Sequence, residues 1–201
     1  MIELKAKKKL GSFALDAELQ DEGFVCLTGR NGSGKTTLLN IIAGVYKPDE
    51  GFVKINSNPI TDLGAEKKQV VLVTSESCIP NFTVEKHLTW GAKLRKRRVE
   101  GSEVAEVRKA LGINYGGKVS KLSLGMKERV ALATALLASP KVILVDEAFG
   151  NIDNRTDFIN AYRKYAGKSK IDVIFSTQHP EDSKSADHLY LMENGRVTKQ
   201  F

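Results

Sequence analysis

The pattern of apolar and polar positions predicts two groups of short strands. Residues 2–6, 13–19, 24–29 and 52–56 form strand-like runs, the last of them after the turn signal KPDEG, and make the N-terminal portion rich in strands. Farther along the chain, short runs rich in Val and Ile occupy residues 69–73, 141–147, 172–177 and 188–193. Such runs are typical of strands that are covered on both faces in a parallel sheet.

Helical segments separate the strands of the second group. The apolar spacing predicts helices over residues 35–45, 83–98, 102–112, 123–138 and 155–167, with Thr83 and Ser102 as candidate N-caps. Strands that alternate with helices predict an α/β fold. No strand-like run interrupts residues 78–125 or so, and we expect a helical insertion there.

Composition supports one compact domain in a reducing compartment. The chain has 201 residues, of which 41% are apolar and 27% charged. No apolar run approaches the length of about 20 residues that crosses a bilayer, and the N-terminus lacks the apolar stretch of a signal peptide. We therefore expect a cytoplasmic protein. Cys26 and Cys78 lack metal-ligand spacing and are expected to stay reduced.

The formal net charge of +7 comes from local clusters. These clusters are Lys7–Lys9, Lys67–Lys68 and Lys93–Arg98. No aromatic residues that could stack on bases interleave with them, and we expect no nucleic-acid partner. We interpret these clusters mainly as solvated parts of the protein surface. The alternative is that they bind an acidic protein partner or an anionic membrane surface.

The strongest chemical signal is the segment GRNGSGKTT, which matches the P-loop pattern G-x-x-x-x-G-K-[ST]. It follows a predicted strand and opens a predicted helix, so that backbone N–H groups and the helix N-terminus would face one phosphate group. Lys35 is expected to reach the β- and γ-phosphates, and the Thr36 hydroxyl is expected to hold Mg²⁺. The predicted phosphate-binding residues are Gly29, Arg30, Asn31, Gly32, Ser33, Gly34, Lys35, Thr36 and Thr37.

A second segment, VILVDE, is an apolar strand that ends in two carboxylates. Asp146 at the strand end suits Mg²⁺ coordination through water, and Glu147 suits a position facing the γ-phosphate and its attacking water. The pair favours nucleotide hydrolysis.

These segments, in this order, resemble the ABC ATPase family, the nucleotide-binding subunits of ATP-binding cassette transporters. The resemblance runs from IELKA to NGRV, and LSLGM (residues 122–126) stands where the family has its LSGGQ signature. NID (Asn151–Asp153) resembles the family's D-loop. The resemblance implies a P-loop NTPase with a RecA-like parallel sheet core, an N-terminal antiparallel β subdomain and an inserted helical subdomain. The core would comprise residues 1–77 and 126–201, and the helical subdomain residues 78–125, within one ATPase domain over residues 1–201.

Outside LSLGM, three positions depart from the family pattern. Where the family stacks an aromatic residue on adenine, the alignment places Leu10, and Phe13 is expected in the strand core. The glutamine that ends the strand before the helical insertion is replaced by Thr74 or Ser75, and Ser75 is a candidate metal contact. Where the family has a histidine that contacts the γ-phosphate, the alignment places Gln178. A shift of one residue would place His179 there instead. Glu147, Gln178 and His179 are therefore the candidate catalytic residues.

In the family, two subunits face head to tail and the signature of each caps the ATP held by the other. Ser123 is expected to be the N-cap of its helix and, with Gly125, to bind the partner's γ-phosphate. Leu124 and Met126 replace the family's glycine and glutamine, which removes the reciprocal half of a capping box.

The resemblance implies an ATP-hydrolysing subunit that uses ATP and Mg²⁺. It would form a homo- or heterodimer and drive a separate transmembrane permease from the inner face of the cell membrane. A regulatory or scaffolding module with little hydrolysis is the alternative, motivated by the missing glutamine and histidine. A small-molecule kinase would need an acceptor pocket and leaves LSLGM unexplained. DNA-repair relatives would need a long coiled-coil insertion that this chain lacks.

Overall fold

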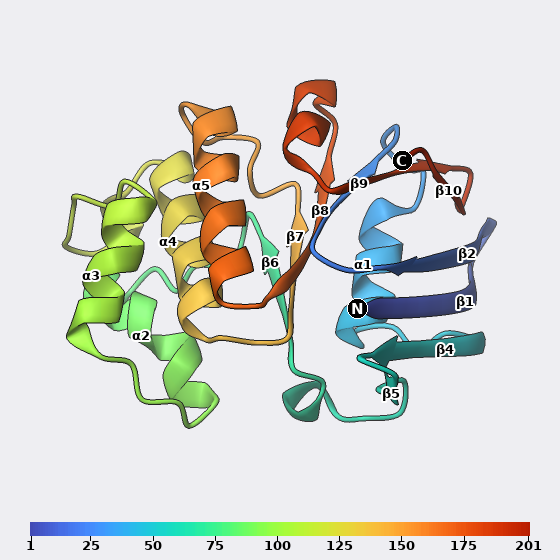
Figure 1. Cartoon of the computed structure of the whole chain (residues 1–201), viewed down its shortest axis with the longest axis horizontal. Helices are drawn as coiled ribbons and strands as arrows, with labels where there is room; N and C mark the ends of the chain where they lie inside the picture. Colours follow the sequence, from blue (N-terminus) through green and yellow to red (C-terminus); the bar gives the residue numbers. More distant parts are fainter.

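Two β-sheets lie on either side of one helix in the computed structural model, which describes residues 1–201 (Figure 1). This helix, α1 (Lys35–Ala43), contributes to a core cluster that contains residues of both sheets. Its buried apolar side chains are Leu38, Leu39, Ile41 and Ile42. Helix α1, which begins at Lys35 within the P-loop pattern, is therefore packed between the two sheets.

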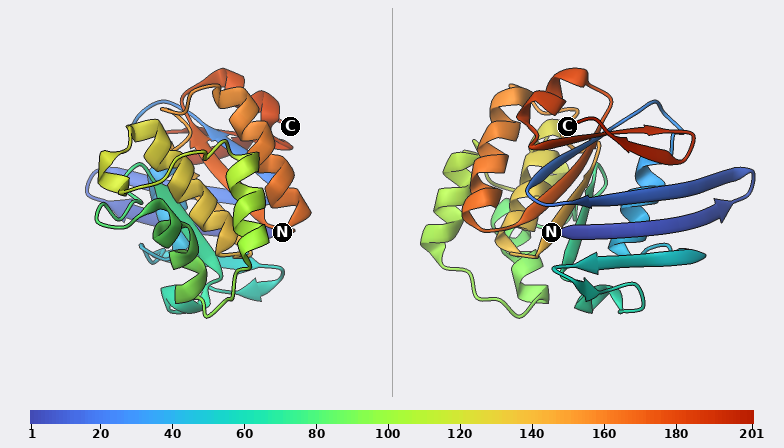
Figure 2. Two further views of the ribbon diagram at one scale, coloured as in Figure 1. Left: turned by 90° about the vertical axis from the view of Figure 1, so that its left-hand side faces the viewer. Right: turned by 45° about the vertical axis from the view of Figure 1, so that its right-hand side comes forward.

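The first sheet is antiparallel and has the strand order β2-β1-β4-β5. Its strands are β1 (Ile2–Leu10), β2 (Phe13–Asp21), β4 (Glu50–Ile55) and the two-residue β5 (Asn58–Pro59). Figure 2 shows the long β1–β2 hairpin extending to one side of the molecule. The three strands predicted over residues 2–6, 13–19 and 52–56 are confirmed, and only β5 was not predicted.

The second sheet has the order β10-β9-β3-β8-β7-β6, and all neighbours are parallel except β10 and β9. The strand predicted over residues 24–29 belongs here, beside the later strands of the chain. The strands are β3 (Phe24–Thr28), β6 (Val70–Thr74), β7 (Val142–Asp146), β8 (Asp172–Thr177), β9 (His188–Glu193) and β10 (Arg196–Lys199). The predicted parallel sheet and α/β class are confirmed.

Four further helices lie on the side of the parallel sheet opposite to α1 (Figure 1). They are α2 (Val84–Leu94), α3 (Gly101–Ala110), α4 (Leu124–Leu137) and α5 (Arg155–Lys168). Helices α4 and α5 pack against the strands of the sheet, and α2 and α3 pack on these two helices. Each overlaps a predicted helix and α2 is four residues shorter than predicted at its C-terminal end, since Arg95 is its C-cap. The division into a helical subdomain over residues 78–125 stays a prediction.

The basic clusters are largely engaged within the chain. The Nζ of Lys7 lies 3.1 Å from Glu50, and that of Lys8 lies 2.6 Å from Asp49. Lys68 is only 3% exposed and donates to the carbonyl oxygens of Ile60 and Thr61 at 2.7 and 3.1 Å. Burial lowers the pKa of Lys68. The interpretation as a solvated face is therefore wrong for Lys68.

The predicted N-caps have different outcomes. Thr83 caps α2, because its hydroxyl accepts a hydrogen bond of 3.2 Å from the backbone N–H of Lys86. Ser102 lies inside α3, whose N-cap is Glu100, and its hydroxyl makes no capping bond. The helix begins one residue before Ser102 because the extended residue Glu100 already supplies the first acceptor carbonyl, to Val104.

We expect Thr83→Ala to lower the free energy of unfolding by about 1 kcal/mol, because one N–H of the first turn of α2 loses its acceptor. Ser102→Ala is the matched control and should change it by less than about 0.5 kcal/mol. Urea denaturation of the three proteins checks this. Equal losses in both variants would contradict the capping role of Thr83.

Candidate functional site

The P-loop connects the end of β3 to the start of α1 through a tight backbone path. Gly29 has a φ of 149°, and a Cβ atom there would lie 2.2 Å from the carbonyl oxygen of Met192. Only glycine fits this approach. Gly34 is the N-cap of α1, so the free N–H groups of the first helical turn open at the loop.

Lys35 is the first residue of α1, and its side chain is held inside the loop. Its Nζ donates to the carbonyl oxygens of Gly29 and Arg30 at 2.9 and 3.2 Å. The same atom lies 3.6 Å from a carboxylate oxygen of Glu147. The lysine, only 5% exposed, is thus preorganised beside the loop and the carboxylate.

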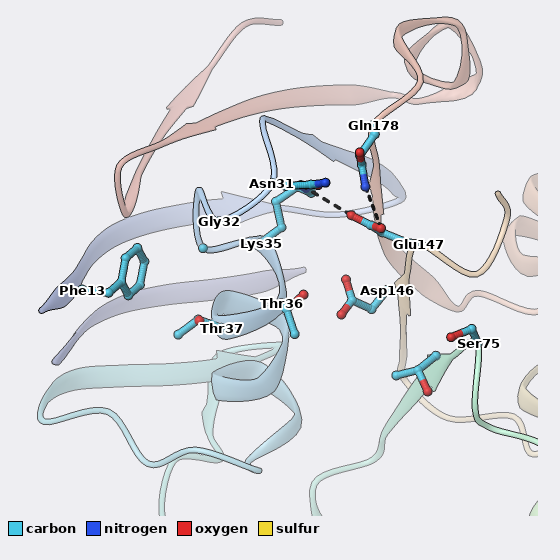
Figure 3. A pocket seen from close by; sticks show the side chains of 12 residues that line it. Phe13, Asn31, Gly32, Lys35, Thr36, Thr37, Ser75, Asp146, Glu147 and Gln178 are labelled. Atoms are coloured by element: carbon cyan, nitrogen blue, oxygen red, sulfur yellow. Dashed lines mark hydrogen bonds and ion pairs between the residues drawn. The ribbon is translucent and has the colours of Figure 1, made fainter. Parts of the chain in front are cut away.

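The two carboxylates of the VILVDE segment are oriented by one hydroxyl of the neighbouring strand. Ser176 on β8 donates to Asp146 Oδ1 at 2.7 Å and accepts from the backbone N–H of Glu147 at 3.0 Å. Glu147 has a φ of 55°, in the left-handed region that non-glycine residues seldom adopt. This backbone turn directs the Glu147 side chain toward the P-loop (Figure 3).

Gln178 and His179 follow β8, and their side chains lie in different places. The amide of Gln178 donates to Glu147 Oε2 at 2.8 Å, and this contact is drawn in Figure 3. His179 lines a smaller adjacent hollow of about 230 Å³, which Glu147 and Gln178 also line. Of the two candidates, Gln178 borders the pocket of Lys35 and contacts Glu147.

These residues surround one pocket of about 480 Å³ (Figure 3). Both Thr74 and Ser75 line it, but only the hydroxyl of Thr74 is hydrogen-bonded within the chain, to Ser77 and to the N–H of Glu76. The hydroxyl of Ser75 stays available to a ligand. The full lining is Phe13, Asn31, Gly32, Gly34, Lys35, Thr36, Thr37, Thr74, Ser75, Asp146, Glu147 and Gln178.

Phe13, and not Leu10, is the residue that lines the pocket at the position expected for an adenine-stacking side chain. Its ring packs partly on the core, as expected, but it also lines the pocket, whereas Leu10 does not and is 37% exposed. The Phe13 Cζ lies 2.7 Å from the place that a Cβ of Gly34 would take. Phe13 and the buried Leu15 point to the same side of β2. At Phe13 this side of the strand faces the N-terminus of α1.

The LSLGM segment lies outside this pocket, at the start of α4. Ser123 is the N-cap as predicted, and its hydroxyl accepts from the backbone N–H of Met126 at 3.3 Å. Gly125 has a role within the chain, since a Cβ atom there would lie 2.3 Å from the carbonyl oxygen of Asn151. Leu124 is 46% exposed.

Two residues of α4 that the sequence did not single out hold the segment Asn151–Asp153. The buried carboxylate of Glu128 accepts from the N–H and the side-chain amide of Asn151 at 3.2 and 2.8 Å. Burial raises the pKa of Glu128. Arg129 donates to the carbonyl oxygen of Asp153 at 2.6 Å. No local sequence pattern marks these two residues, because their contacts join segments that are far apart in the chain.

Comparisons with known proteins place the chain in a family. The family model described as ABC transporter matches residues 14–150. The molybdenum import ATP-binding protein ModC of Rhizobium meliloti is 34% identical over 98% of this chain and 58% of its own length. The molybdate/tungstate import ATP-binding protein WtpC of Archaeoglobus fulgidus is 31% identical over 99% of this chain and 86% of its own length.

Solved structures show the same fold. The dimeric structure of a bacterial ABC transporter cassette has a TM-score of 0.83 at 24% identity and covers 100% of this chain and 99% of that one. A dimeric post-hydrolysis state bound to ADP and Pi has a TM-score of 0.81 at 24% identity, covering 100% and 99%.

The fold and the loop between β3 and α1 define a P-loop NTPase. The chain belongs to the ABC transporter family. It spans 58% of the length of the ModC relative and 86% of the WtpC relative. No helix in the structure combines the length and apolar character that a membrane span requires.

We expect Phe13→Ala to weaken ATP binding about tenfold, because stacking of a base on an aromatic ring contributes about 1–3 kcal/mol. Leu10→Ala is the control and should leave the dissociation constant within about twofold, since Leu10 does not line the pocket. Titration calorimetry with ATP measures both. If Leu10→Ala weakened ATP binding more than Phe13→Ala did, Leu10 and not Phe13 would be the residue that contacts adenine.

Proposed function

We propose that this protein is the ATP-hydrolysing subunit of an ABC transporter that drives separate transmembrane permease subunits. The observation that carries the proposal is the convergence of Lys35, Asp146, Glu147 and Gln178 on one pocket at the carboxyl ends of parallel strands. The pocket thus brings together a cation, two carboxylates and a hydrogen-bonding amide, the groups that hydrolysis of a nucleotide phosphate requires.

The phosphates of ATP would lie on the backbone between Gly29 and Thr37. The free N–H groups at the N-terminus of α1 and the Lys35 ammonium supply positive potential, and Lys35 needs no new rotamer to reach the loop. At the far end of the pocket, the ring of Phe13 offers a face for the adenine base (Figure 3).

The donor set in the pocket fits Mg²⁺. Thr36, Asp146 and Ser75 all line it and offer hydroxyl and carboxylate oxygens, the ligands that this hard cation prefers. When bound with the nucleotide, Mg²⁺ would neutralise charge on the phosphates. The bond from Ser176 holds Asp146 in place for this role.

Hydrolysis would use Glu147 as the base. A water that attacks the γ-phosphorus loses a proton to the carboxylate, the bond to the bridging oxygen breaks, and ADP and phosphate leave. Gln178 holds one carboxylate oxygen at 2.8 Å, and Lys35 lies 3.6 Å from the other. His179 stays a candidate for contact with the γ-phosphate from the adjacent hollow.

A second ATP-binding subunit would complete the site. Ser123 and the N–H groups of Leu124 and Gly125 do not line the pocket of their own chain, and we propose that they bind the γ-phosphate of a partner. Two of the similar solved structures are described as dimeric. Homodimer and heterodimer both satisfy this geometry.

The direction of transport that we propose is import. The relatives from Rhizobium meliloti and Archaeoglobus fulgidus are both named as import ATP-binding proteins. The subunit would act on the cytoplasmic face of the membrane, where ATP is supplied, and bind there to its permease.

We expect Glu147→Gln to lower steady-state ATP hydrolysis by about 100-fold or more, because a positioned general base contributes about 10²–10⁴-fold. Binding of ATP should persist, since the phosphate contacts are unchanged. Glu18→Gln, on the exposed face of β2, is the control. A wild-type rate no higher than that of Glu147→Gln, even with the permease present, would contradict the proposed ATP-hydrolysing function. It would favour a regulatory module with little hydrolysis.

We expect Ser123→Arg to block ATP-driven dimerisation while monomers still bind ATP, because the arginine side chain would fill the position of the partner's γ-phosphate. Static light scattering in the Glu147→Gln background measures the mass with and without ATP. Ser102→Arg, at an exposed serine of α3, is the matched control. Unchanged dimerisation of Ser123→Arg would exclude this role for LSLGM.

A further inference from the structure

A buried carboxylate outside the proposed mechanism lies in the segment that follows Gln178 and His179. Asp182, in the short 3₁₀ helix Pro180–Ser185, is only 1% exposed. A buried carboxylate without partners is costly, and its partners therefore show what it does in the fold. Both of its oxygens are hydrogen-bonded, each to a different element of the structure.

The contacts of Asp182 close a small loop around the end of β8. Its Oδ2 accepts a hydrogen bond of 2.6 Å from the hydroxyl of Thr177, the last residue of β8. That hydroxyl accepts from the backbone N–H of His179 at 3.0 Å, and the N–H of Asp182 donates to the carbonyl oxygen of His179 at 3.1 Å. The backbone on both sides of Gln178 is therefore fixed by Asp182.

The second oxygen of Asp182 reaches another element. Its Oδ1 accepts from the Nε of Arg155 at 2.8 Å. Arg155 is the first residue of α5 and follows the segment Asn151–Asp153, which Glu128 and Arg129 of α4 hold. Asp182 therefore joins the segment of Gln178 to the segment that LSLGM packs against.

The side chain of Gln178 has no comparable support of its own. It is exposed and is held by one hydrogen bond to Glu147. The position of its backbone consequently decides whether the amide reaches the carboxylate. A shift of about 1 Å in such a contact can cost about 100-fold in rate.

We propose that Asp182 is a positioning residue for hydrolysis: it anchors residues 177–179 to the start of α5, so that Gln178 presents its amide to Glu147. This inference rests on the proposed function. Arg155 and Thr177 act through the same anchor. A carboxylate suits the role, because it offers one acceptor oxygen to each of the two donors, Arg155 and Thr177.

Two variants interrupt the anchor in different ways. Asp182→Asn keeps the shape but leaves one acceptor oxygen for the two donors, Arg155 and Thr177. Thr177→Val keeps the size and removes the hydroxyl, so that Asp182 loses a donor and the N–H of His179 loses its acceptor. Thr177→Ser restores the hydroxyl. Glu181→Gln is the matched control in the same 3₁₀ helix, since Glu181 is exposed and pairs only with Lys184.

The experiment measures kcat, KM, the dissociation constant of ATP and the melting temperature for these proteins. We expect kcat to fall about 10- to 100-fold in Asp182→Asn and Thr177→Val, with ATP affinity within about twofold. Thr177→Ser should recover most of kcat, and Glu181→Gln should match the wild type. Should Asp182→Asn not fold, Thr177→Val carries the test.

Hydrogen exchange at residues 177–182 gives a readout that does not depend on turnover. We expect the amide of His179 to exchange at least tenfold faster in Thr177→Val, with β7 and α1 unchanged. Wild-type kcat retained in both variants, or loss of kcat and ATP affinity together with the melting temperature, would overturn the positioning role. Absence of hydrolysis in the wild type would instead refute the proposed function, while the exchange result still decides whether Asp182 anchors the segment.

Discussion

The in-register parallel pairing of β3, β7 and β8 is the constraint on which the site depends. Thr28 pairs with Thr177, and Asp146 pairs with Ser176, so the three strands end at the same edge of the sheet. The P-loop, the carboxylate pair and the segment of Gln178 each begin at that edge. Residues far apart in the sequence thereby reach one pocket without a long connecting loop.

Polar side chains at the strand ends refine what the pairing brings together. The Ser176 hydroxyl bonds to both Asp146 and the backbone of Glu147, whose left-handed conformation costs about 1–3 kcal/mol. The Thr177 hydroxyl links the next residues to Asp182. These two buried hydroxyls of β8 therefore orient the backbone and side chains of the candidate catalytic groups.

Local sequence patterns predicted much of this arrangement, because the P-loop and the VILVDE segment each carry their own geometry. The α/β fold, the parallel strands and the Ser123 cap followed from the same local information. Phe13 did not, since its place depends on how the β1–β2 hairpin packs on α1. The roles of Glu128 and Asp182 also depend on long-range contacts, and a charged residue within a helix or loop gives no signal that it is buried.

The central claim is that these strand ends form a hydrolytic site for ATP. Its most direct test is ATP turnover by the purified protein in ¹⁸O-labelled water, with the label followed by mass spectrometry. The account predicts that ¹⁸O enters the released phosphate and is absent from ADP, and that Lys35→Ala abolishes the reaction. No released phosphate, label in ADP, or turnover that persists in Lys35→Ala would contradict it.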